Sequence, residues 1–254
     1  VNAANTQHLD TYKNYLYERL QRKGFDSTDV HRLATRDRHV FSSLMLAHGH
    51  GDGLVTGATR KSAHVLELVN HVFDADAEHG AVGVTALLHK GRIVLMADTL
   101  VHEWPDEHDL ATIAERGAAV ARHLGLEPRV AFVSFSTFGY PVSERAEKMH
   151  IAPSVLKERG VDFEYEGEMT VDVALNAKSA EQYPFSRLTG PANILVVPAR
   201  HSASISVKLM QELAGATVIG PILSGIDKSI QICSTNSTAN DILNMAVLAS
   251  CKVG

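Results

Sequence analysis

The stretch RVAFVSFS at residues 129–136 predicts a buried β-strand, because valine, alanine and phenylalanine follow one another before a hydroxyl-rich end. After it the sequence alternates between helical and strand patterns. The helices are expected through Val155 and Leu156, over 204–215 and over 240–250, and the strands over 161–168, 193–198, 217–223 and 229–234. Strands separated by helices are typical of βαβ crossovers, which build a mostly parallel sheet with helices on both faces. The sequence therefore predicts an α/β fold.

The residues before this stretch predict helices and then a hairpin. Apolar spacing predicts a helix over 8–24 that ends at Gly24, a second capped by Ser27 or Thr28 and running through Leu33, and a third containing Phe41, Leu44 and Met45. Two β-rich runs, 81–90 and 91–100, meet at Lys90-Gly91, which indicates a hairpin turn. Residues 106–125 give the clearest helical pattern, with Asp106 as the N-cap.

The composition of the 254 residues, with 45% hydrophobic and 21% charged, is typical of a folded globular protein. A net charge of −5 without basic runs argues against nucleic-acid binding, since that binding depends on clustered Lys and Arg. No apolar run reaches the ~18 residues of a membrane span, and Cys233 and Cys251 are too few for a secreted disulfide framework. Without a signal-peptide pattern, a cytoplasmic location is expected. The missing initiator Met indicates a piece of a longer protein.

Polar residues follow two of the predicted strands, where an open α/β sheet binds its ligands. Residues 134–139, SFSTFG, could present backbone N–H groups to an anion such as phosphate, or could simply cap the next helix. Arg200 and His201 follow the strand at 193–198 and precede a helix. For this second strand end a solvated turn is the simpler interpretation.

A third strand end runs from Cys233 into a hydroxyl-rich turn and the last helix. Thr238 and Asp241 have the spacing of a capping box, which explains Asp241 by itself. The alternative is that Ser234 and Asp241 flank a pocket, with Asp241 accepting a proton from a thiol or hydroxyl group.

Signatures of other sites are weak or absent. His48 and His50 resemble a metal-binding pair, with Asp52 as the nearby third ligand, but in this glycine-rich stretch we expect a surface turn and no metal. No G-x-G-x-x-G follows a strand and no P-loop occurs, so no dinucleotide or nucleotide fingerprint is present. Trp104 beside Pro105 is expected to pack rather than to stack on a ligand.

Long strings of this sequence resemble a known family. They are GLVTGATR (53–60), VLMADTLV (94–101), GLEPRVAFVSFSTFG (125–139), YEGEMTVDVALN (165–176), GPANILVVP (190–198), GATVIGPILSGIDKSIQI (215–232) and NDILNMAVLAS (240–250). They occur in this order in phosphate acetyltransferases. More narrowly, SFSTFG, DFEYEGEM, FSRLTGPAN and HSASISVKLMQELAGATVIGP resemble the C-terminal domain of bacterial hybrid NADP-dependent malic enzymes, in which a malic enzyme region precedes a phosphate acetyltransferase-like domain.

The resemblance covers nearly the whole chain and implies a two-lobed α/β fold, like that of isocitrate dehydrogenase, with a cleft between mostly parallel sheets. Residues 1–70 and 222–254 are expected to form the first lobe, and residues 71–221 an inserted second lobe. The resemblance also implies that the chain is a fragment, without the malic enzyme region and without the first part of the acetyltransferase-like domain.

The sequence departs from the active transferases at charged positions. Their motif S-R-G-x-S-x-x-D supplies a Ser and an Arg at the thiol of coenzyme A and an Asp proposed as the base; the matching residues here are Ser234, Thr235 and Asp241. Glu67 stands where the family has an Arg, and the early P-R of the family aligns with Gln7 and His8. Acyl-phosphate transfer depends on fixed cations, and losing one such donor typically costs ~3–4 kcal/mol of transition-state stabilisation.

The resemblance therefore implies a non-catalytic domain that binds acetyl-CoA and regulates malate decarboxylation. Ser136, Thr137, Ser234, Thr235 and Asp241 are the expected acetyl-CoA-binding residues, with Ser234 and Asp241 at the family's catalytic positions. No cofactor is expected in this chain; NADP and a divalent metal belong to the malic enzyme region. A homo-oligomer, a dimer or larger, is also implied. An active phosphate acetyltransferase, a purely structural domain and a dehydrogenase remain alternatives, although no paired-carboxylate metal site supports the last.

Overall fold

The computed structural model describes residues 3–75 and 80–251. The chain divides into two compact units, one formed by Val1–Glu78 with Ile226–Lys252 and the other by His79–Gly225. The boundaries expected from the resemblance, at 70–71 and 221–222, lie earlier in the chain than these, at 78–79 and 225–226. The first unit keeps the whole of helix α4 and the turn after it, and strand β7 of the second unit runs through Ser224. No helix among the described residues has the length and apolar character needed to span a membrane.

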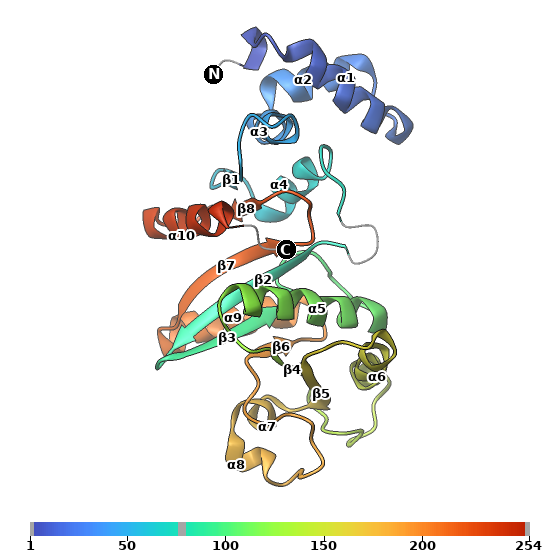
Figure 1. Ribbon diagram of the computed structural model, residues 1–254, viewed down its shortest axis with the longest axis vertical. Helices are drawn as coiled ribbons and strands as arrows, with labels where there is room; N and C mark the ends of the chain where they lie inside the picture. Colours follow the sequence, from blue (N-terminus) through green and yellow to red (C-terminus); the bar gives the residue numbers. More distant parts are fainter. Residues whose placement is uncertain (1–2, 76–79, 252–254) are drawn as a thin grey trace. The chain divides into compact units, whose positions relative to one another are not determined.

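The first unit is mainly helical and contains one short parallel sheet (Figure 1). Its elements are η1 (Ala3–Asn5), α1 (Leu9–Leu20), η2 (Gln21–Lys23), α2 (Ser27–Arg36), α3 (Arg38–Ala47), β1 (Leu54–Gly57), α4 (Ser62–Val69), β8 (Ile230–Cys233) and α10 (Ala239–Ser250). Strands β1 and β8 are distant in the sequence but pair in parallel, with Gly57 opposite Cys233. A Cβ at Gly57 would collide with the carbonyl oxygen of Cys233, so glycine is required where the two strands end.

Helix ends in this unit follow the predicted residues with one correction. Gly24 adopts the left-handed conformation that closes the first helical segment, as predicted. The N-cap of α2, however, is Asp26 and not Ser27 or Thr28, because the Asp26 carboxylate accepts hydrogen bonds from the backbone N–H groups of Thr28 and Asp29. A carboxylate with two such donors satisfies more of the free amides of the first turn than a hydroxyl can.

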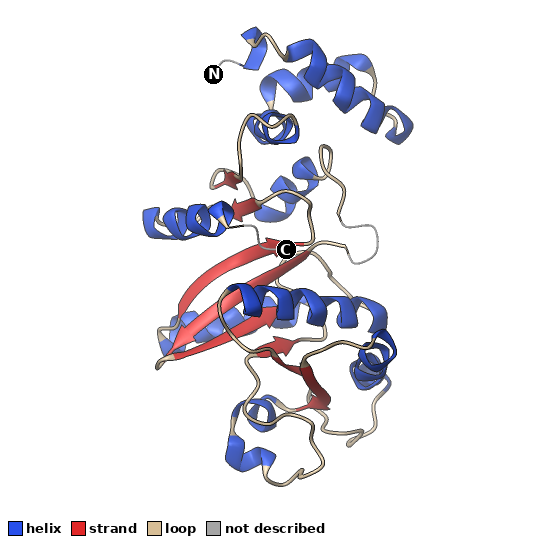
Figure 2. Cartoon of the chain, viewed as in Figure 1, coloured by secondary structure: helices blue, strands red, loops and turns tan. Residues whose placement is uncertain are grey.

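The second unit is a six-stranded sheet between two layers of helices (Figure 2). The strand order is β5-β4-β6-β3-β2-β7, in which the first four strands are mutually parallel and β2 runs antiparallel to β3 and β7. The elements are β2 (Val82–His89), β3 (Arg92–Ala97), α5 (Glu107–His123), β4 (Arg129–Val133), α6 (Glu144–Arg159), β5 (Glu164–Met169), α7 (Val171–Leu175), α8 (Ala177–Ala180), β6 (Ile194–Val196), α9 (Arg200–Ala214) and β7 (Thr217–Ser224). The expected α/β fold, with a mostly parallel sheet covered on both faces, is confirmed.

Local sequence signals explain the edges of this sheet. Lys90 and Gly91 both have positive φ, which forms the tight hairpin turn between β2 and β3. Asp106 caps α5 in a capping box with Asp109, as the sequence predicted for Asp106. Helix α5 covers one face of the sheet, while α9 lies on the other (Figure 1).

Helix α10 depends on the capping box that the sequence predicted. The Thr238 hydroxyl accepts from the Asp241 N–H at 3.2 Å, and the Asp241 carboxylate accepts from the Thr238 N–H at 2.7 Å. Replacement Asp241→Ala removes half of this box. We expect the free energy of unfolding to fall by ~0.5–2 kcal/mol in urea titrations. Asn240→Ala, at the neighbouring exposed position, is the matched control and should stay within ~0.5 kcal/mol of the unsubstituted chain. Equal stability of Asp241→Ala and the control would contradict the capping role.

Candidate functional site

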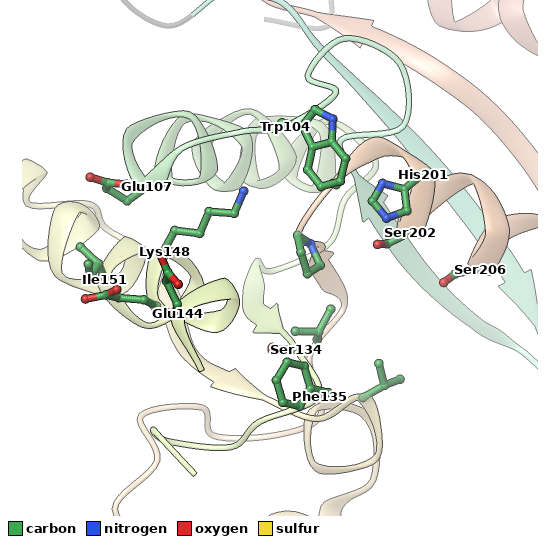
Figure 3. A pocket seen from close by; sticks show the side chains of 15 residues that line it. Trp104, Glu107, Ser134, Phe135, Glu144, Lys148, Ile151, His201, Ser202 and Ser206 are labelled. Carbon is green, nitrogen blue, oxygen red and sulfur yellow. The ribbon is translucent and has the colours of Figure 1, made fainter. Parts of the chain in front are cut away.

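A pocket of about 1130 Å³ lies at the carboxyl ends of β4 and β6 in the second unit (Figure 3). Its walls come from the segments that follow the strands and from the first turns of α5, α6 and α9. The lining residues are Trp104, Glu107, Val133, Ser134, Phe135, Glu144, Glu147, Lys148, Ile151, Val171, Pro198, Ala199, His201, Ser202 and Ser206. Ligands of open α/β sheets bind at this edge, so the pocket is the candidate site of this unit.

The charged side chains of the pocket are mostly negative. Glu107 from α5 and Glu144 and Glu147 from α6 contribute three carboxylates. The fourth charged group, Lys148, donates from Nζ to the carbonyl oxygen of Pro105 at 2.7 Å. One ammonium group, already bound to a carbonyl, does not balance three carboxylates. A phosphate dianion in this pocket would therefore meet net repulsion.

Aromatic and apolar side chains form the rest of the wall. Trp104 is 70% exposed, and its ring lies 4.9 Å from that of His201, centroid to centroid. Figure 3 shows these two rings side by side above Phe135, which is itself exposed. The packing expected for Trp104 takes the form of a surface contact with His201, because the loop after β3 leaves the ring mostly exposed. His201 likewise is part of the pocket wall rather than of a simple solvated turn.

Several amides of the hydroxyl-rich loop at 134–139 are hydrogen-bonded within the protein. The N–H of Phe138 donates to the carbonyl oxygen of Glu168, and the N–H of Gly139 donates to the Glu168 carboxylate at 2.8 Å. Ser136 is fully buried, and its hydroxyl also hydrogen-bonds to Glu168. At Gly139, the anion that the loop could bind is thus a carboxylate of the protein itself. Since α6 begins only at Glu144, the loop also does not lead directly into a helix.

Thr137, in the same loop, is hydrogen-bonded to other residues of the protein. Its hydroxyl oxygen accepts from the N–H of Thr170 at 3.2 Å, and its own N–H donates to the carbonyl oxygen of Tyr140. Ser134 and Phe135, rather than Ser136 and Thr137, reach the pocket wall. The predicted residues of this strand end therefore shape the loop, while their neighbours face the cavity.

Glu168 is the buried charge that holds this loop, a role that no pattern in the sequence predicts. Its side chain is 1% exposed, and it also accepts from His150 Nδ1 at 2.8 Å. Burial alone would raise the pKa of this carboxyl. Hydrogen bonds from Gly139, His150 and Ser136 outweigh that effect, and the pKa lies below its usual value of 4.5.

A depressed pKa makes Glu168 stabilising at neutral pH and less so in acid. Because the ionised form is favoured in the folded state, this contribution is present above the ordinary Glu pKa and is lost as the pH falls through the lower, folded-state value. Glu168→Gln should lower the free energy of unfolding at pH 7 by ~1–3 kcal/mol and flatten its decline below about pH 4.5. Denaturant titrations at a series of pH values measure both effects. If the free energy of unfolding of Glu168→Gln falls below pH 4.5 as steeply as that of the unsubstituted chain, Glu168 does not carry this charge.

The other predicted residues lie at the end of β8 in the first unit. The Ser234 hydroxyl lies 3.2 Å from that of Ser237, and Ser234 and Thr235 are both exposed. The Asp241 carboxylate accepts from both the N–H and the hydroxyl of Thr238, at 2.7 and 2.9 Å. The pKa of the Cys233 thiol is raised by burial and, to a smaller extent, by the charge of Asp241. The two predicted functional groups, Ser234 and Asp241, are therefore each engaged by another residue.

Arg60, which sequence analysis did not single out, is a cation in the segment that follows strand β1. It follows β1, whose last residues pair with those of β8, and the N–H of Ala58 donates to the carbonyl oxygen of Cys233. The Arg60 guanidinium donates to the carboxylate of Asp37 at 2.6 Å. Burial would raise the pKa of Asp37, but its backbone hydrogen bonds and the contact with Arg60 hold it below the ordinary value.

Glu67, at a position where the resemblance implies an Arg, lies on α4 with an exposed side chain. The Glu67 carboxylate lies 3.3 Å from His64 Nδ1. The Arg that the resemblance implies at this position is therefore replaced by a negatively charged residue. The charge there is opposite to the one that an acyl phosphate needs.

The histidine-rich turn of the first unit is built around Tyr12. The Tyr12 hydroxyl lies 2.6 Å from His50 Nδ1, and His48 Nδ1 lies 2.8 Å from the carbonyl oxygen of Leu44. No group of three or more His, Cys, Asp or Glu side chains in residues 3–75 and 80–251 could hold a metal ion. His48 and His50 here make hydrogen bonds within the unit.

Comparison with known proteins identifies the family. Residues 1–250 match the model of the phosphate acetyl/butaryl transferase family. The chain is 50% identical over all 254 residues to an NADP-dependent malic enzyme of Rhizobium meliloti, of which it covers 33%. It is 30% identical over 234 residues to a phosphate acetyltransferase of Bacillus subtilis, with 91% of this chain and 72% of that protein covered.

Solved structures agree with this assignment. A phosphotransacetylase from Streptococcus pyogenes superposes with a TM-score of 0.91 at 27% identity, over 100% of this chain and 78% of that one. The chain spans about a third of the length of the malic enzymes that it matches. The resemblance stated from the sequence is confirmed, and the chain belongs to the phosphate acetyl/butaryl transferase family.

Proposed function

We propose that this chain is a regulatory, non-catalytic member of its family that binds acetyl-CoA and forms oligomers within an NADP-dependent malic enzyme. The observation that carries the proposal is the charge at the end of β8. Thr235 follows Ser234 where active relatives of this family have an Arg, and Arg60, the cation at the end of the neighbouring strand β1, is bound by Asp37. An acyl-phosphate reaction needs a free cation to stabilise the developing negative charge.

The hydrogen bonds of Asp241, the candidate general base, also support a non-catalytic domain. Asp241 already accepts two hydrogen bonds from Thr238, and Ser234 is hydrogen-bonded to Ser237. A base must lie within hydrogen-bonding reach of the proton that it removes. One carboxylate oxygen of Asp241, Oδ2, accepts both of these hydrogen bonds, and this engagement supports binding without turnover.

The pocket of the second unit suits the uncharged part of a thioester. Its apolar and aromatic wall can pack against a pantetheine arm, and the hydroxyls of Ser134, Ser202 and Ser206 can bond to its amides. Its three carboxylates disfavour inorganic phosphate and acetyl phosphate. Ser234, Thr235 and Asp241 are the candidate acetyl-CoA contacts of the first unit considered by itself, and in the second unit Ser136 and Thr137 act through the loop that they hold.

The malic enzyme relatives supply the proposed context. In them a region like this chain makes up about a third of a longer protein. Acetyl-CoA would then inhibit malate decarboxylation, provided that it binds two global states of the enzyme with different affinity. NADP and a divalent metal are assigned to the remainder of such a protein, and the expected location is the cytoplasm.

An active phosphate acetyltransferase is the second candidate, favoured by Arg60 at the end of β1. If Arg60 left Asp37, it could supply the missing cation. Separation would remove the ion pair of Asp37 and leave its carboxylate with the hydrogen bonds from the N–H groups of His39 and Val40.

One experiment separates the two candidates. Acetyl-CoA is titrated into the purified chain by calorimetry, and the same sample is then given phosphate while free thiol is measured. The proposal predicts saturable heat and no thiol release above the uncatalysed rate. Thiol release at the rate of an ordinary transferase would establish the second candidate. If neither heat nor thiol release is observed, the domain is purely structural.

Substitution by a bulky side chain tests the residues that are assigned to the ligand. Thr235→Trp should weaken acetyl-CoA binding at least ~10-fold, since an exposed threonine at the proposed contact is replaced by a ring that fills the space. Thr28→Trp, at an exposed threonine on α2, is the matched control and should bind as the unsubstituted chain does. In a longer protein that joins this chain to a malic enzyme region, Thr235→Trp should relieve inhibition and leave malate turnover intact. Equal affinity of the two variants would place the ligand elsewhere.

A further inference from the structure

The loop of residues 98–105 joins strand β3 to helix α5 and carries Trp104, which lines the pocket of the second unit (Figure 3). Asp98 holds the start of this loop. Its carboxylate is buried and accepts hydrogen bonds from the backbone N–H groups of residues 100–102, at distances between 2.7 and 3.2 Å. A carboxylate with several N–H donors makes strong, charge-assisted hydrogen bonds. The first half of the loop is therefore fixed.

Two helices beside the pocket hold the loop through side chains that contain no imidazole. The Arg200 guanidinium, at the start of α9, donates to the carbonyl oxygen of Leu100 at 3.2 Å and lies 3.5 Å from the carboxylate of Glu103. Lys148 of α6 donates to the carbonyl oxygen of Pro105 at 2.7 Å. The loop is thus tied to both α9 and α6.

The contact of this loop with α5 is made by an imidazole, that of His102. Its Nδ1 donates to the Asp98 carboxylate at 2.8 Å, and its Nε2 lies 3.9 Å from the carboxylate of Asp109. Asp109 lies in the first turn of α5, where it forms the capping box with Asp106. A protonated His102 therefore joins the buried carboxylate of the loop to the carboxylate at the start of the helix.

Only one of the two contacts of His102 survives the loss of a proton. A neutral ring with its hydrogen on Nδ1 still donates to Asp98, but its Nε2 then presents a lone pair to the carboxylate of Asp109. The hydrogen bond to Asp98 raises the pKa of His102 above its ordinary value of 6.5; burial opposes this, and the charges of Asp98, Asp109 and Asp106 add to it. Because the folded-state pKa is raised, the contact with Asp109 is present below pH 6.5 and is lost as the pH rises through the higher, folded-state value.

We propose that His102 is a proton-dependent positioning residue of the pocket. As an imidazolium it holds the loop of residues 98–105, and with it Trp104, against the first turn of α5. Loss of the proton loosens this wall and lowers the affinity for the ligand of the pocket. The last step rests on the proposed function, in which the pocket takes the pantetheine arm of acetyl-CoA. The loosening of the loop does not depend on it.

Trp104 is the only tryptophan of the chain, so its fluorescence anisotropy reports on this wall alone. Between pH 6 and pH 9 we expect the anisotropy to fall in one transition with a midpoint above 6.5, because the ring moves more freely on a loosened loop. His102→Gln has no titrating ring and should give the low, high-pH anisotropy throughout. His201→Gln removes the imidazole that contacts the Trp104 ring, and His108→Gln removes an exposed imidazole of α5. Both controls should keep the transition.

A second variant tests the partner of the imidazolium. Asp109→Asn removes a negative charge that attracts the ring, so the midpoint of the anisotropy transition should move to lower pH. Circular dichroism checks that each variant folds, and the Asp109→Asn midpoint decides the matter if His102→Gln does not. A flat anisotropy in the unsubstituted chain, a transition that persists in His102→Gln or disappears in His201→Gln, or an unmoved midpoint in Asp109→Asn would overturn the proposal.

Acetyl-CoA binding is measured calorimetrically at pH 7 and pH 9 on the same variants. The dissociation constant of the unsubstituted chain and of His108→Gln should rise about threefold between these values, and that of His102→Gln should not change. An anisotropy transition without acetyl-CoA binding would reject the proposed function and keep the loop contact. Saturable binding with the same pH dependence in His102→Gln as in the unsubstituted chain would reject the positioning role and keep the proposed function.

Discussion

The ion pair between Asp37 and Arg60 decides what the end of the β1–β8 sheet can do. Strand β1 delivers Arg60 to the edge at which β8 delivers Ser234, and Asp37 at the start of α3 binds the guanidinium at 2.6 Å. The same carboxylate caps α3 by accepting from His39 and Val40. A group with two structural roles is not easily displaced by a ligand. The edge therefore keeps the hydroxyls of the family, and its Arg60 guanidinium is paired with a carboxylate of the protein.

In the second unit too, a carboxylate of the protein binds a backbone amide that could otherwise bind an anionic ligand. The loop after β4 has the hydroxyls and glycine of an anion site, but the carboxylate of Glu168 occupies its Gly139 amide and binds Ser136. The adjoining pocket adds Glu107, Glu144 and Glu147. The carboxylates that line the pocket of the second unit therefore disfavour an acyl phosphate there.

The sequence predicts the architecture of this protein well because the responsible signals are local. The hairpin at Lys90-Gly91, the cap at Asp106 and the capping box of Thr238 and Asp241 each depend on residues within a few positions of one another. The parallel pairing of β1 with β8 involves residues far apart in the chain and could be expected only from the family resemblance.

The functional groups are harder to predict for the same reason. Glu168 and Gly139, and Arg60 and Asp37, meet only when the chain has folded, so their spacing in the sequence gives no signal. The outward turn of Trp104 is likewise set by the loop after β3 and not by its neighbours in sequence. The direct test of the account is to titrate inorganic phosphate and acetyl-CoA separately into this chain and follow the heat of each. The account predicts saturable binding of acetyl-CoA and none of phosphate; saturable phosphate binding of comparable affinity would contradict it.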